Sequence, residues 1–278
     1  MNSLINKVVI VTGGANGIGA QIVQELIKEQ TKYVAIVDLD DASGVTLQNK
    51  LKEEYGRDVA GFYKCDVTND AILHGIFDKI VEDFGTVDVV INNAGIATEK
   101  IDTYKKLIDI NFTATVSSTL KALELMRADN GGAGGTIINI SSIAALTLMS
   151  PGVFIYSATK SAVLHLSTCM GKEDYYRHTK VRVMTTCFGA TDTEIIDKMI
   201  SFDELVTENM LNIIEGFKKE NMIQSSNAAA QGVVEAYKTG KTGSTWLIDG
   251  GKIMDISDRI CDAFKIMSTG IKIEAKTT

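Results

Sequence analysis

Short apolar runs alternate along this chain with longer stretches of helical spacing. Residues 7–12 form a β-branched run that ends at two glycines, which is typical of a buried strand. In residues 17–30, Ile18, Ile22 and Leu26 recur at a spacing that places them on one face of a helix. The same pattern predicts further strands at residues 33–37, 59–63, 87–91, 136–140, 181–186 and 245–248, and helices at residues 44–55, 69–84, 102–127, 157–176 and 227–238.

Seven predicted strands that alternate with helices define the fold class. Parallel strands joined through helices by right-handed crossovers give an α/β fold with a doubly wound parallel seven-stranded sheet. The sequence contains no repeat, low-complexity linker or boundary of a second domain. We therefore expect a single domain over residues 1–255 and a C-terminal tail over residues 256–278.

The composition excludes several classes of protein. Of the 278 residues, 45% are hydrophobic and 23% are charged, which suits one large core. The formal net charge of -7 argues against a nucleic-acid partner, because phosphates favour basic surfaces. The four cysteines show no C-x-x-C spacing and the three histidines are dispersed, so we expect reduced thiols and no metal site. No apolar run reaches the ~18 residues that a membrane span needs, and we expect a soluble cytoplasmic protein.

A glycine-rich turn follows the first predicted strand. Gly13, Gly17 and Gly19 lie between this strand and the first predicted helix. Glycines there permit a tight turn and bring the backbone close to a diphosphate at the helix N-terminus, as in a Rossmann fold. The alternative is an ordinary loop, but the strand–turn–helix context favours a dinucleotide site.

The second predicted strand leads to Asp38, about 20 residues beyond the glycines, as in dinucleotide-binding folds. A carboxylate there accepts hydrogen bonds from the ribose hydroxyls of adenosine and repels a 2′-phosphate, which favours NAD over NADP. The alternative is that Asp38 caps a helix. Asp66 and the segment Ala94–Gly95 follow the next two strands at the same sheet edge, and they could contact adenine and ribose or be turn residues.

Tyr156 and Lys160 stand four residues apart in a predicted helix, shortly after Ser141 and Ser142. Positions i and i+4 share a helix face, so the ammonium group can lie beside the phenol. A nearby positive charge lowers the pKa of tyrosine from ~10 and suits it to general acid–base catalysis. Alternatively, the two residues lie on a solvated helix face. The glycine-rich turn and Asp38 upstream favour the catalytic interpretation, because they predict a cofactor for such a base to serve.

Together these motifs resemble the classical short-chain dehydrogenase/reductase family. Matching segments run from about residue 7 to residue 250, and they include Asn92 to Gly95 and Asn139 to Ser142. The chain is most similar to the branch of insect-type alcohol dehydrogenases and 15-hydroxyprostaglandin dehydrogenases. The features that carry this likeness are the glycines at 131–135, the segment 224–230 and the segment 243–249.

The resemblance implies a role for each matching residue. Tyr156 would be the acid–base, Ser142 would orient the reacting oxygen, and Lys160 would lower the pKa of Tyr156 and bind the nicotinamide ribose. Asn111 would hold a water that links Lys160 to solvent. The residues expected to contact the cofactor are Gly13, Asn16, Gly17, Ile18, Gly19, Asp38, Asp66, Val67, Asn93, Ala94, Gly95, Tyr156, Lys160, Gly189, Thr191 and Thr193.

The chain departs from the family pattern in two places. Phe188 stands where the family has proline, although Gly189 and Thr193 remain, so Thr193 is still expected to meet the carboxamide. The interval from Ser142 to Tyr156 is 14 residues, one more than is common in the family, which suggests an extra residue near Pro151.

Residues 194–223 are rich in Ile, Met, Leu and Phe. The resemblance places a helical substrate lid at about residues 190–225, and such side chains suit an adaptable apolar pocket. Alternatively they are the buried faces of two helices.

We therefore expect an NAD-dependent enzyme that interconverts a lipophilic or secondary alcohol and its carbonyl. The alternatives are an NADPH-dependent carbonyl reductase and a catalytically silent binding or storage protein on the same fold. Apolar residues on more than one face of the segments 102–127 and 157–176 predict a homodimer or homotetramer.

Overall fold

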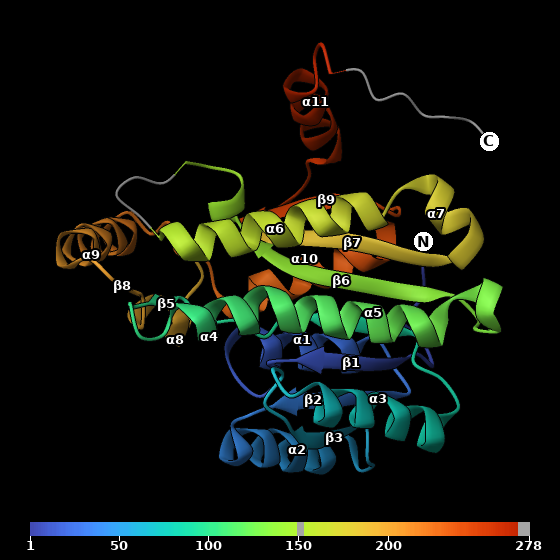
Figure 1. Ribbon diagram of the computed structural model, residues 1–278. Helices are drawn as coiled ribbons and strands as arrows, with labels where there is room; N and C mark the ends of the chain where they lie inside the picture. Colours follow the sequence, from blue (N-terminus) through green and yellow to red (C-terminus); the bar gives the residue numbers. More distant parts are fainter. Residues whose placement is uncertain (149–152, 272–278) are drawn as a thin grey trace.

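A computed structural model describes residues 1–148 and 153–271. Its main sheet has the strand order β10-β9-β7-β6-β4-β1-β2-β3 (Figure 1). All seven predicted strands are present and parallel. The strands of this sheet are β1 (Val8–Thr12), β2 (Tyr33–Asp38), β3 (Ala60–Lys64), β4 (Val89–Asn92), β6 (Gly135–Ser142), β7 (Val181–Phe188), β9 (Thr245–Asp249) and β10 (Lys252–Asp255).

The eighth strand corrects the expected count of seven. β10 pairs antiparallel with β9 at the sheet edge. Gly250 and Gly251 both have positive φ, 54° and 73°, which is the geometry that a two-residue hairpin turn requires. The hydrophobic pattern missed β10 because three of its four residues are exposed and the fourth is half-buried.

Helices cover both faces of the sheet. In β1, Val9 and Val11 enter the core beneath α1 (Gly17–Lys28), α2 (Asp41–Tyr55) and α10 (Ser226–Thr239). Val8 and Ile10 enter the opposite core, beneath α3 (Asp70–Phe84) and α5 (Ala114–Met126). This period of two shows why buried parallel strands read as continuous apolar runs. In Figure 1, α3, α5 and α6 (Phe154–Met170) lie in front of the sheet.

Two predicted helices are divided in the structure. The segment predicted at 102–127 consists of α4 (Tyr104–Ile108), the π-helical turn η1 (Asp109–Thr113) and α5. The segment predicted at 157–176 consists of α6 and α7 (Glu173–Thr179). They separate at Gly171, where a Cβ would lie 2.4 Å from the Gly243 Cα. Tertiary packing therefore sets this break. Short 3₁₀ turns are η2 (Ala128–Asn130) and η3 (Ile143–Ala145).

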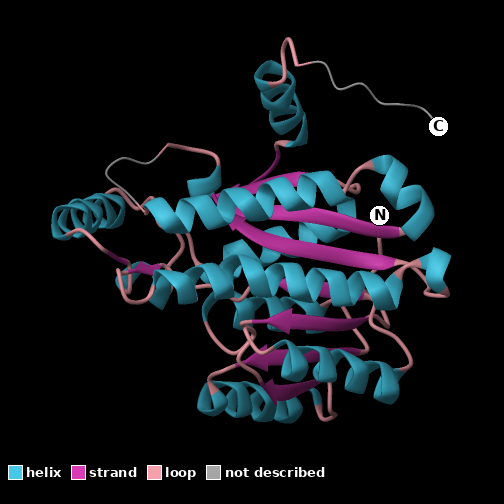
Figure 2. Cartoon of the chain, viewed as in Figure 1, coloured by secondary structure: helices cyan, strands magenta, loops and turns pink. Residues whose placement is uncertain are grey.

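Residues 194–223, which are expected to form a substrate lid and are called the lid segment below, lie beyond the carboxyl ends of the strands (Figure 1). The lid segment comprises α8 (Glu194–Asp197), β8 (Ile200–Ser201) and α9 (Glu204–Lys219). β8 pairs in parallel with β5 (Thr98–Glu99), and this small sheet is separate from the main one (Figure 2).

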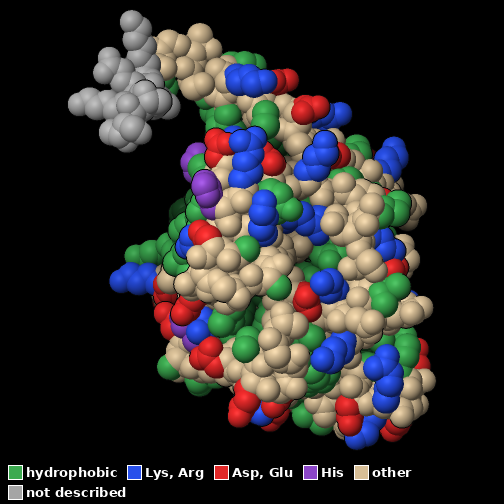
Figure 3. Space-filling model, turned by 90° about the vertical axis from the view of Figure 1, so that its right-hand side faces the viewer, with side chains coloured by type: hydrophobic (Ala, Val, Ile, Leu, Met, Phe, Trp, Pro, Cys, Tyr) green, Lys and Arg blue, Asp and Glu red, His purple; other side chains and the backbone are tan. Residues whose placement is uncertain are grey.

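The region expected to be a tail begins with a helix, α11 (Ser257–Met267), none of whose residues is buried. On the face that Figure 3 shows, acidic and basic side chains are interspersed, so the net charge is not concentrated there. Within residues 1–148 and 153–271, no helix combines the length and the apolar character of a membrane span.

Candidate active site

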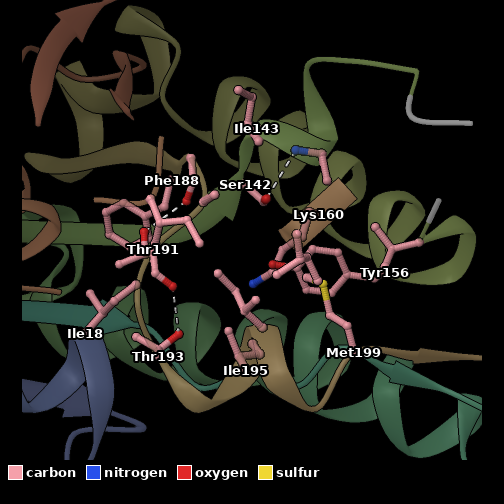
Figure 4. Close-up of a pocket in the computed structure, with 18 of the residues that line it drawn as sticks. Ile18, Ser142, Ile143, Tyr156, Lys160, Phe188, Thr191, Thr193, Ile195 and Met199 are labelled. Atoms are coloured by element: carbon pink, nitrogen blue, oxygen red, sulfur yellow. Dashed lines mark hydrogen bonds between the residues drawn. The ribbon is translucent and has the colours of Figure 1, made fainter. Parts of the chain in front are cut away.

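The main cavity lies at the carboxyl ends of the central strands, where ligands of doubly wound sheets bind. The chain passes from β1 to β2 and β3 on one side, and it returns to β4 on the other side. The cavity encloses about 1100 Å³, its open mouth included. Figure 4 shows Ser142, Tyr156 and Lys160 on one side of it and Ile195 and Met199 of the lid segment on another.

The glycine-rich turn is a close-packed cradle. Gly13 and Gly17 have φ of +62° and +52°, which side chains rarely adopt. A Cβ at Gly13 would lie 2.8 Å from the Ala94 Cα, and a Cβ at Gly19 would lie 1.9 Å from the Gly13 carbonyl oxygen. Asn16, the N-cap of α1, makes no side-chain bond to the first turn of α1. Backbone N–H groups at this helix start are therefore suited to hold a diphosphate, with Ile18 on the cavity wall.

The loop after β4 is tied to this cradle. The Asn93 side chain donates to the carbonyls of Thr12 (3.1 Å) and Gly13 (2.9 Å). The Thr12 hydroxyl accepts from the backbone N–H groups of Asn93 and Ala94. Gly95 comes next, so close to Lys160 that a Cβ there would lie 3.4 Å from Nζ. The predicted residues Asn93, Ala94 and Gly95 therefore connect the glycine-rich turn with the neighbourhood of Lys160.

Asp38 does not cap a helix. Its carboxylate accepts from the N–H of Ala15 (2.9 Å) and of Asp40 (3.1 Å). Asp40 is the N-cap of α2 and accepts from Ser43 N–H. Among the described residues, no Lys or Arg forms an ion pair with Asp38. An acceptor fixed beside the cradle suits a ribose diol and disfavours a 2′-phosphate.

Asp66 and Val67 lie at the end of β3. One Asp66 oxygen accepts from the Thr68 N–H (3.0 Å) and hydroxyl (2.7 Å), and these bonds hold the pKa of Asp66 below its usual value. Val67 is buried. Asp66 is therefore a turn residue, as the sequence allowed. Its hydrogen bonds with Thr68 also orient its carboxyl group at the carboxyl ends of the strands.

Ser142, Tyr156 and Lys160 meet deep in the cavity. Tyr156 is 8% exposed and Lys160 is 4% exposed. Burial raises the pKa of Tyr156, and the neighbouring Ser142 hydroxyl lowers it in part. Burial also lowers the pKa of Lys160 from 10.5 to about 8. Desolvation of each charged form is therefore the main electrostatic effect here.

This result differs from the sequence-based expectation that Lys160 would lower the pKa of Tyr156. Lys160 Nζ lies 5.7 Å from the centroid of the Tyr156 ring and donates to the Ile140 carbonyl (3.1 Å). Spacing along the helix predicted the shared face correctly. It could not predict that removal of water from the phenol would raise its pKa.

Asn111 occupies the π-helical turn η1 and is fully buried. Its side chain accepts from Ile96 N–H (2.8 Å) and donates to the Ile96 carbonyl (2.8 Å) and to Thr159 (3.3 Å). Asn111 therefore clamps the loop after β4 against α6. π-Helical turns within helices are frequent at functional sites.

The loop after β7 completes the cavity. Phe188 is buried and lines it, and Gly189 packs against the Asp249 side chain, whose oxygen would lie 1.8 Å from a Cβ there. The hydroxyl of Thr193 donates to the Thr191 carbonyl (3.3 Å), and a Cβ at Gly17 would lie 3.3 Å from the Thr193 methyl group. The loop thus reaches back to the glycine-rich turn. The expected extra residue near Pro151 falls within residues 149–152, outside the described residues.

Sequence reasoning missed Gln224 as a residue of this site. Its side chain donates to the Thr191 hydroxyl (3.0 Å) and to the Ile248 carbonyl (2.8 Å), and it accepts from Gly251 N–H (3.2 Å). It therefore fixes the loop after β7 to the end of β9. Nothing in the spacing of Gln224 indicates contacts with segments more than 20 residues away.

Comparisons with known proteins agree with this geometry. The family model of short chain dehydrogenases matches residues 7–203. The 15-hydroxyprostaglandin dehydrogenase (NAD(+)) of Homo sapiens is 33% identical over 193 residues, which are 69% of this chain and 71% of that protein. That of Bos taurus is 34% identical over 190 residues, which are 68% and 70%.

A solved structure shows a similar fold. The 3-ketoacyl-(acyl-carrier-protein) reductase from Brucella melitensis, complexed with NADH, has a TM-score of 0.72 and 20% identity. The match covers 90% of this chain and 99% of that one.

The burial of Lys160 has a consequence for stability that can be measured. The folded chain releases this proton near pH 8, whereas the unfolded chain releases it near 10.5. Between these values the unfolded state binds more protons, so the free energy of unfolding rises with pH. Lys160→Met removes a charge whose burial opposes folding below pH 8. We expect this variant to exceed the parent in free energy of unfolding at pH 7 by up to about 3 kcal/mol.

Denaturant unfolding at pH 7, 8.5 and 10 tests this expectation. The advantage of Lys160→Met should shrink as the pH rises. Lys105→Met, at an exposed lysine, is the control and should show no such trend. A difference between Lys160→Met and the parent that stays constant with pH would contradict the assignment.

Proposed function

Because this chain belongs to the short-chain dehydrogenase family, we propose that it is an NAD-dependent oxidoreductase that interconverts an alcohol and its carbonyl by hydride transfer. The observation that carries the proposal is the convergence of Ser142, Tyr156 and Lys160 in the cavity that adjoins the glycine-rich cradle. A base next to a site for a hydride carrier is the minimum that alcohol oxidation requires.

The residues around the cradle fit NAD. Asp38 offers acceptors to a ribose diol, and the N-terminus of α1 offers backbone donors to a diphosphate. When bound, NAD supplies the hydride acceptor. Lys160 and the loop containing Thr191 and Thr193 line the same cavity as Tyr156, which suits them to hold the nicotinamide end. The alternative of an NADPH-dependent reductase is disfavoured by the carboxylate of Asp38.

The catalytic step uses side chains of this chain. In oxidation, the Tyr156 phenolate accepts the hydroxyl proton of the substrate while the Ser142 hydroxyl orients the same oxygen. In reduction, the protonated phenol returns the proton to the carbonyl oxygen. Burial raises the pKa of Tyr156, so the acid form dominates at neutral pH and the base form grows as the pH rises. We therefore expect oxidation to accelerate towards alkaline pH.

An apolar substrate suits the lid segment. Side chains from α8, α9 and the loops beside them face the cavity, namely Ile195, Ile196, Met199, Met210, Ile213, Ile214, Phe217 and Ile223. Their position along an open space supports a substrate pocket over the alternative of two packed helix faces. The relatives named above are dehydrogenases of a hydroxyprostaglandin by name. A lipophilic secondary alcohol is the substrate class that agrees with both observations.

Residues 1–255 would form the catalytic domain with its lid at about 190–225, and residues 256–278 would be a C-terminal tail. The cysteines, Cys65, Cys169, Cys187 and Cys261, are all free, which agrees with a cytoplasmic location.

Removal of the base tests the proposed function directly. Tyr156→Phe should fold and bind NADH but lose about 10²–10⁴-fold in kcat for alcohol oxidation, because only the proton acceptor is lost. Steady-state assays over a panel of alcohols with NAD give the rates, and protein fluorescence gives NADH affinity. Tyr104→Phe, outside the cavity lining, is the control. An active Tyr156→Phe enzyme, or a parent without turnover, would refute the proposal.

The choice of cofactor depends on Asp38. Asp38→Ala should narrow the ratio of kcat/KM between NAD and NADP, because it removes both the acceptor for the ribose hydroxyls and the repulsion of a 2′-phosphate. Asp41→Ala removes an exposed carboxylate nearby and should leave the ratio unchanged. A parent that prefers NADP would show the account of Asp38 to be wrong.

Variants of Met199 and Phe202 distinguish a side chain that lines the cavity from one that packs at the surface of the lid segment. Met199 lines the cavity, whereas Phe202 is 46% exposed and packs against Phe154 with ring centroids 6.0 Å apart. Met199→Ala should change the ranking of alcohols by chain length, by about 1–3 kcal/mol of discrimination. Phe202→Ala should leave the ranking intact. Equal rankings in both variants would remove the ground for a lipophilic substrate.

Assembly is expected because two helices keep apolar side chains away from the core. Leu120 of α5 is 54% exposed, while Val116 of α5 and Leu166 of α6 are half-buried. Pairing of these faces about a two-fold axis would cover them, so we propose a homodimer or homotetramer. Light scattering of the parent should give two or four chain masses, and Leu120→Glu should lower that mass. A parent with the mass of one chain at micromolar concentration would contradict the prediction.

A further inference from the structure

Helix α6 carries both Tyr156 and Lys160, yet its own N-cap residue makes no side-chain hydrogen bond to its first turn. The first N–H groups of a helix have no partner within the helix, and when buried they need another acceptor. Val153 holds the N-cap position and has no polar side chain to offer. By contrast, α2, α3, α9 and α10 are each capped by their own N-cap side chain, from Asp40, Asn69, Asp203 and Ser225.

The carboxylate of Glu99 supplies the missing cap from more than 50 residues away. It accepts from the backbone N–H of Phe154 (3.0 Å), Ile155 (2.8 Å) and Tyr156 (3.0 Å). The last of these donors belongs to the proposed acid–base itself. Glu99 therefore fixes the first turn of α6 at the point from which the Tyr156 side chain departs.

Glu99 is buried without an opposite charge. Its exposed fraction is 0%, and among the described residues no Lys, Arg or His forms an ion pair with it. The charge is instead stabilised by the three N–H groups, by a hydroxyl and by the positive end of the α6 dipole. An ionised group in such a place is costly to bury unless every one of these partners is kept.

The hydroxyl partner of Glu99 belongs to the lid segment. Ser201 of β8 donates to the Glu99 carboxylate (3.1 Å), and the two residues also face each other in the β5–β8 pair. The N–H of Ser201 donates to the Thr207 hydroxyl on α9 (3.0 Å). One carboxylate thus touches the lid segment and the catalytic helix at the same time.

Glu99 also lies three residues after Ile96, whose backbone Asn111 clamps. The cofactor loop, the lid segment and α6 therefore meet around β5. We propose that Glu99 is a positioning residue for catalysis, which holds Tyr156 in place through the first turn of α6 and links that position to the lid segment through Ser201. This inference rests on the proposed function, because it assigns a role in the same reaction.

Variants of the two partners separate the two contacts. Glu99→Gln keeps the shape of the side chain but replaces one acceptor oxygen by a donor, so at least one N–H of α6 loses its partner. Ser201→Ala removes only the link to the lid. Asp88→Asn is the control, because Asp88 also accepts from a distant backbone N–H, that of Val8 at 2.9 Å, and it lies with its ion-pair partner Lys7 at the amino ends of β1 and β4, away from the cavity. All variants are compared at the same folded fraction.

Kinetics with NAD and an alcohol give the first readout. Glu99→Gln should lower kcat about 10–100-fold, because a small displacement of a reacting group is costly, while NADH affinity changes less than about threefold. Ser201→Ala should raise the KM for the alcohol about fivefold, as expected for one lost hydrogen bond, and change kcat much less. Asp88→Asn should change neither quantity. A Glu99→Gln enzyme with the kcat of Asp88→Asn would overturn the proposal.

Amide hydrogen exchange gives a readout that does not depend on activity. Glu99→Gln should speed exchange at least about tenfold at residues 154–156 and also in the lid segment, since both lose a buried partner. Ser201→Ala should speed it in the lid segment alone. Unchanged exchange at residues 154–156 in Glu99→Gln would refute the cap, whether or not the parent is active. An inactive parent would refute the proposed function, but it would not by itself refute the cap. If Glu99→Gln does not fold, the test rests on Ser201→Ala. An unchanged KM for the alcohol together with unchanged amide exchange in the lid segment of Ser201→Ala would then overturn the proposal.

Discussion

Parallel pairing of β1 with both β2 and β4 is the constraint on which the site depends. Because of this pairing, the chain continues from β1 to β2 and β3 on one side of β1, and it then crosses to form β4 on the other side of β1. The carboxyl ends of these strands then share one edge, with an opening between the loops that follow them. The glycine-rich turn, Asp38 and the loop after β4 are brought together by this topology, although they lie far apart in the sequence.

Close backbone contacts then fix this edge. Asn93 donates to two carbonyls of the glycine-rich turn, and Asn111 clamps Ile96 two residues beyond Ala94. Such contacts leave little room for side chains, which is why glycine stands at positions 13 and 19. The same loop continues into β5 and Glu99, so the contacts that support the glycine-rich turn and those that support α6 are continuous.

Burial sets the electrostatic character of the side chains that we propose to take part in the reaction. Tyr156 and Lys160 are both nearly inaccessible, and loss of water favours the neutral form of each. Cys187 is buried beside Lys160, and burial likewise raises the pKa of its thiol to about 12, so it stays neutral. The site therefore holds few fixed charges close to the phenol, and a proton can pass to or from a substrate oxygen in a dry environment.

The sequence by itself determined the alternation of strands and helices, the sheet class and part of the cavity lining, including Ser142, Tyr156 and Lys160. These follow from local rules: apolar runs, glycine conformations and the i, i+4 spacing of Tyr156 and Lys160. Only the tertiary structure decided the antiparallel β10, the division of α6 from α7, the contacts of Gln224 and the cap that Glu99 provides for α6. Each depends on segments that are distant in sequence, and the net pKa shift of Tyr156 depends on burial, which no local spacing encodes.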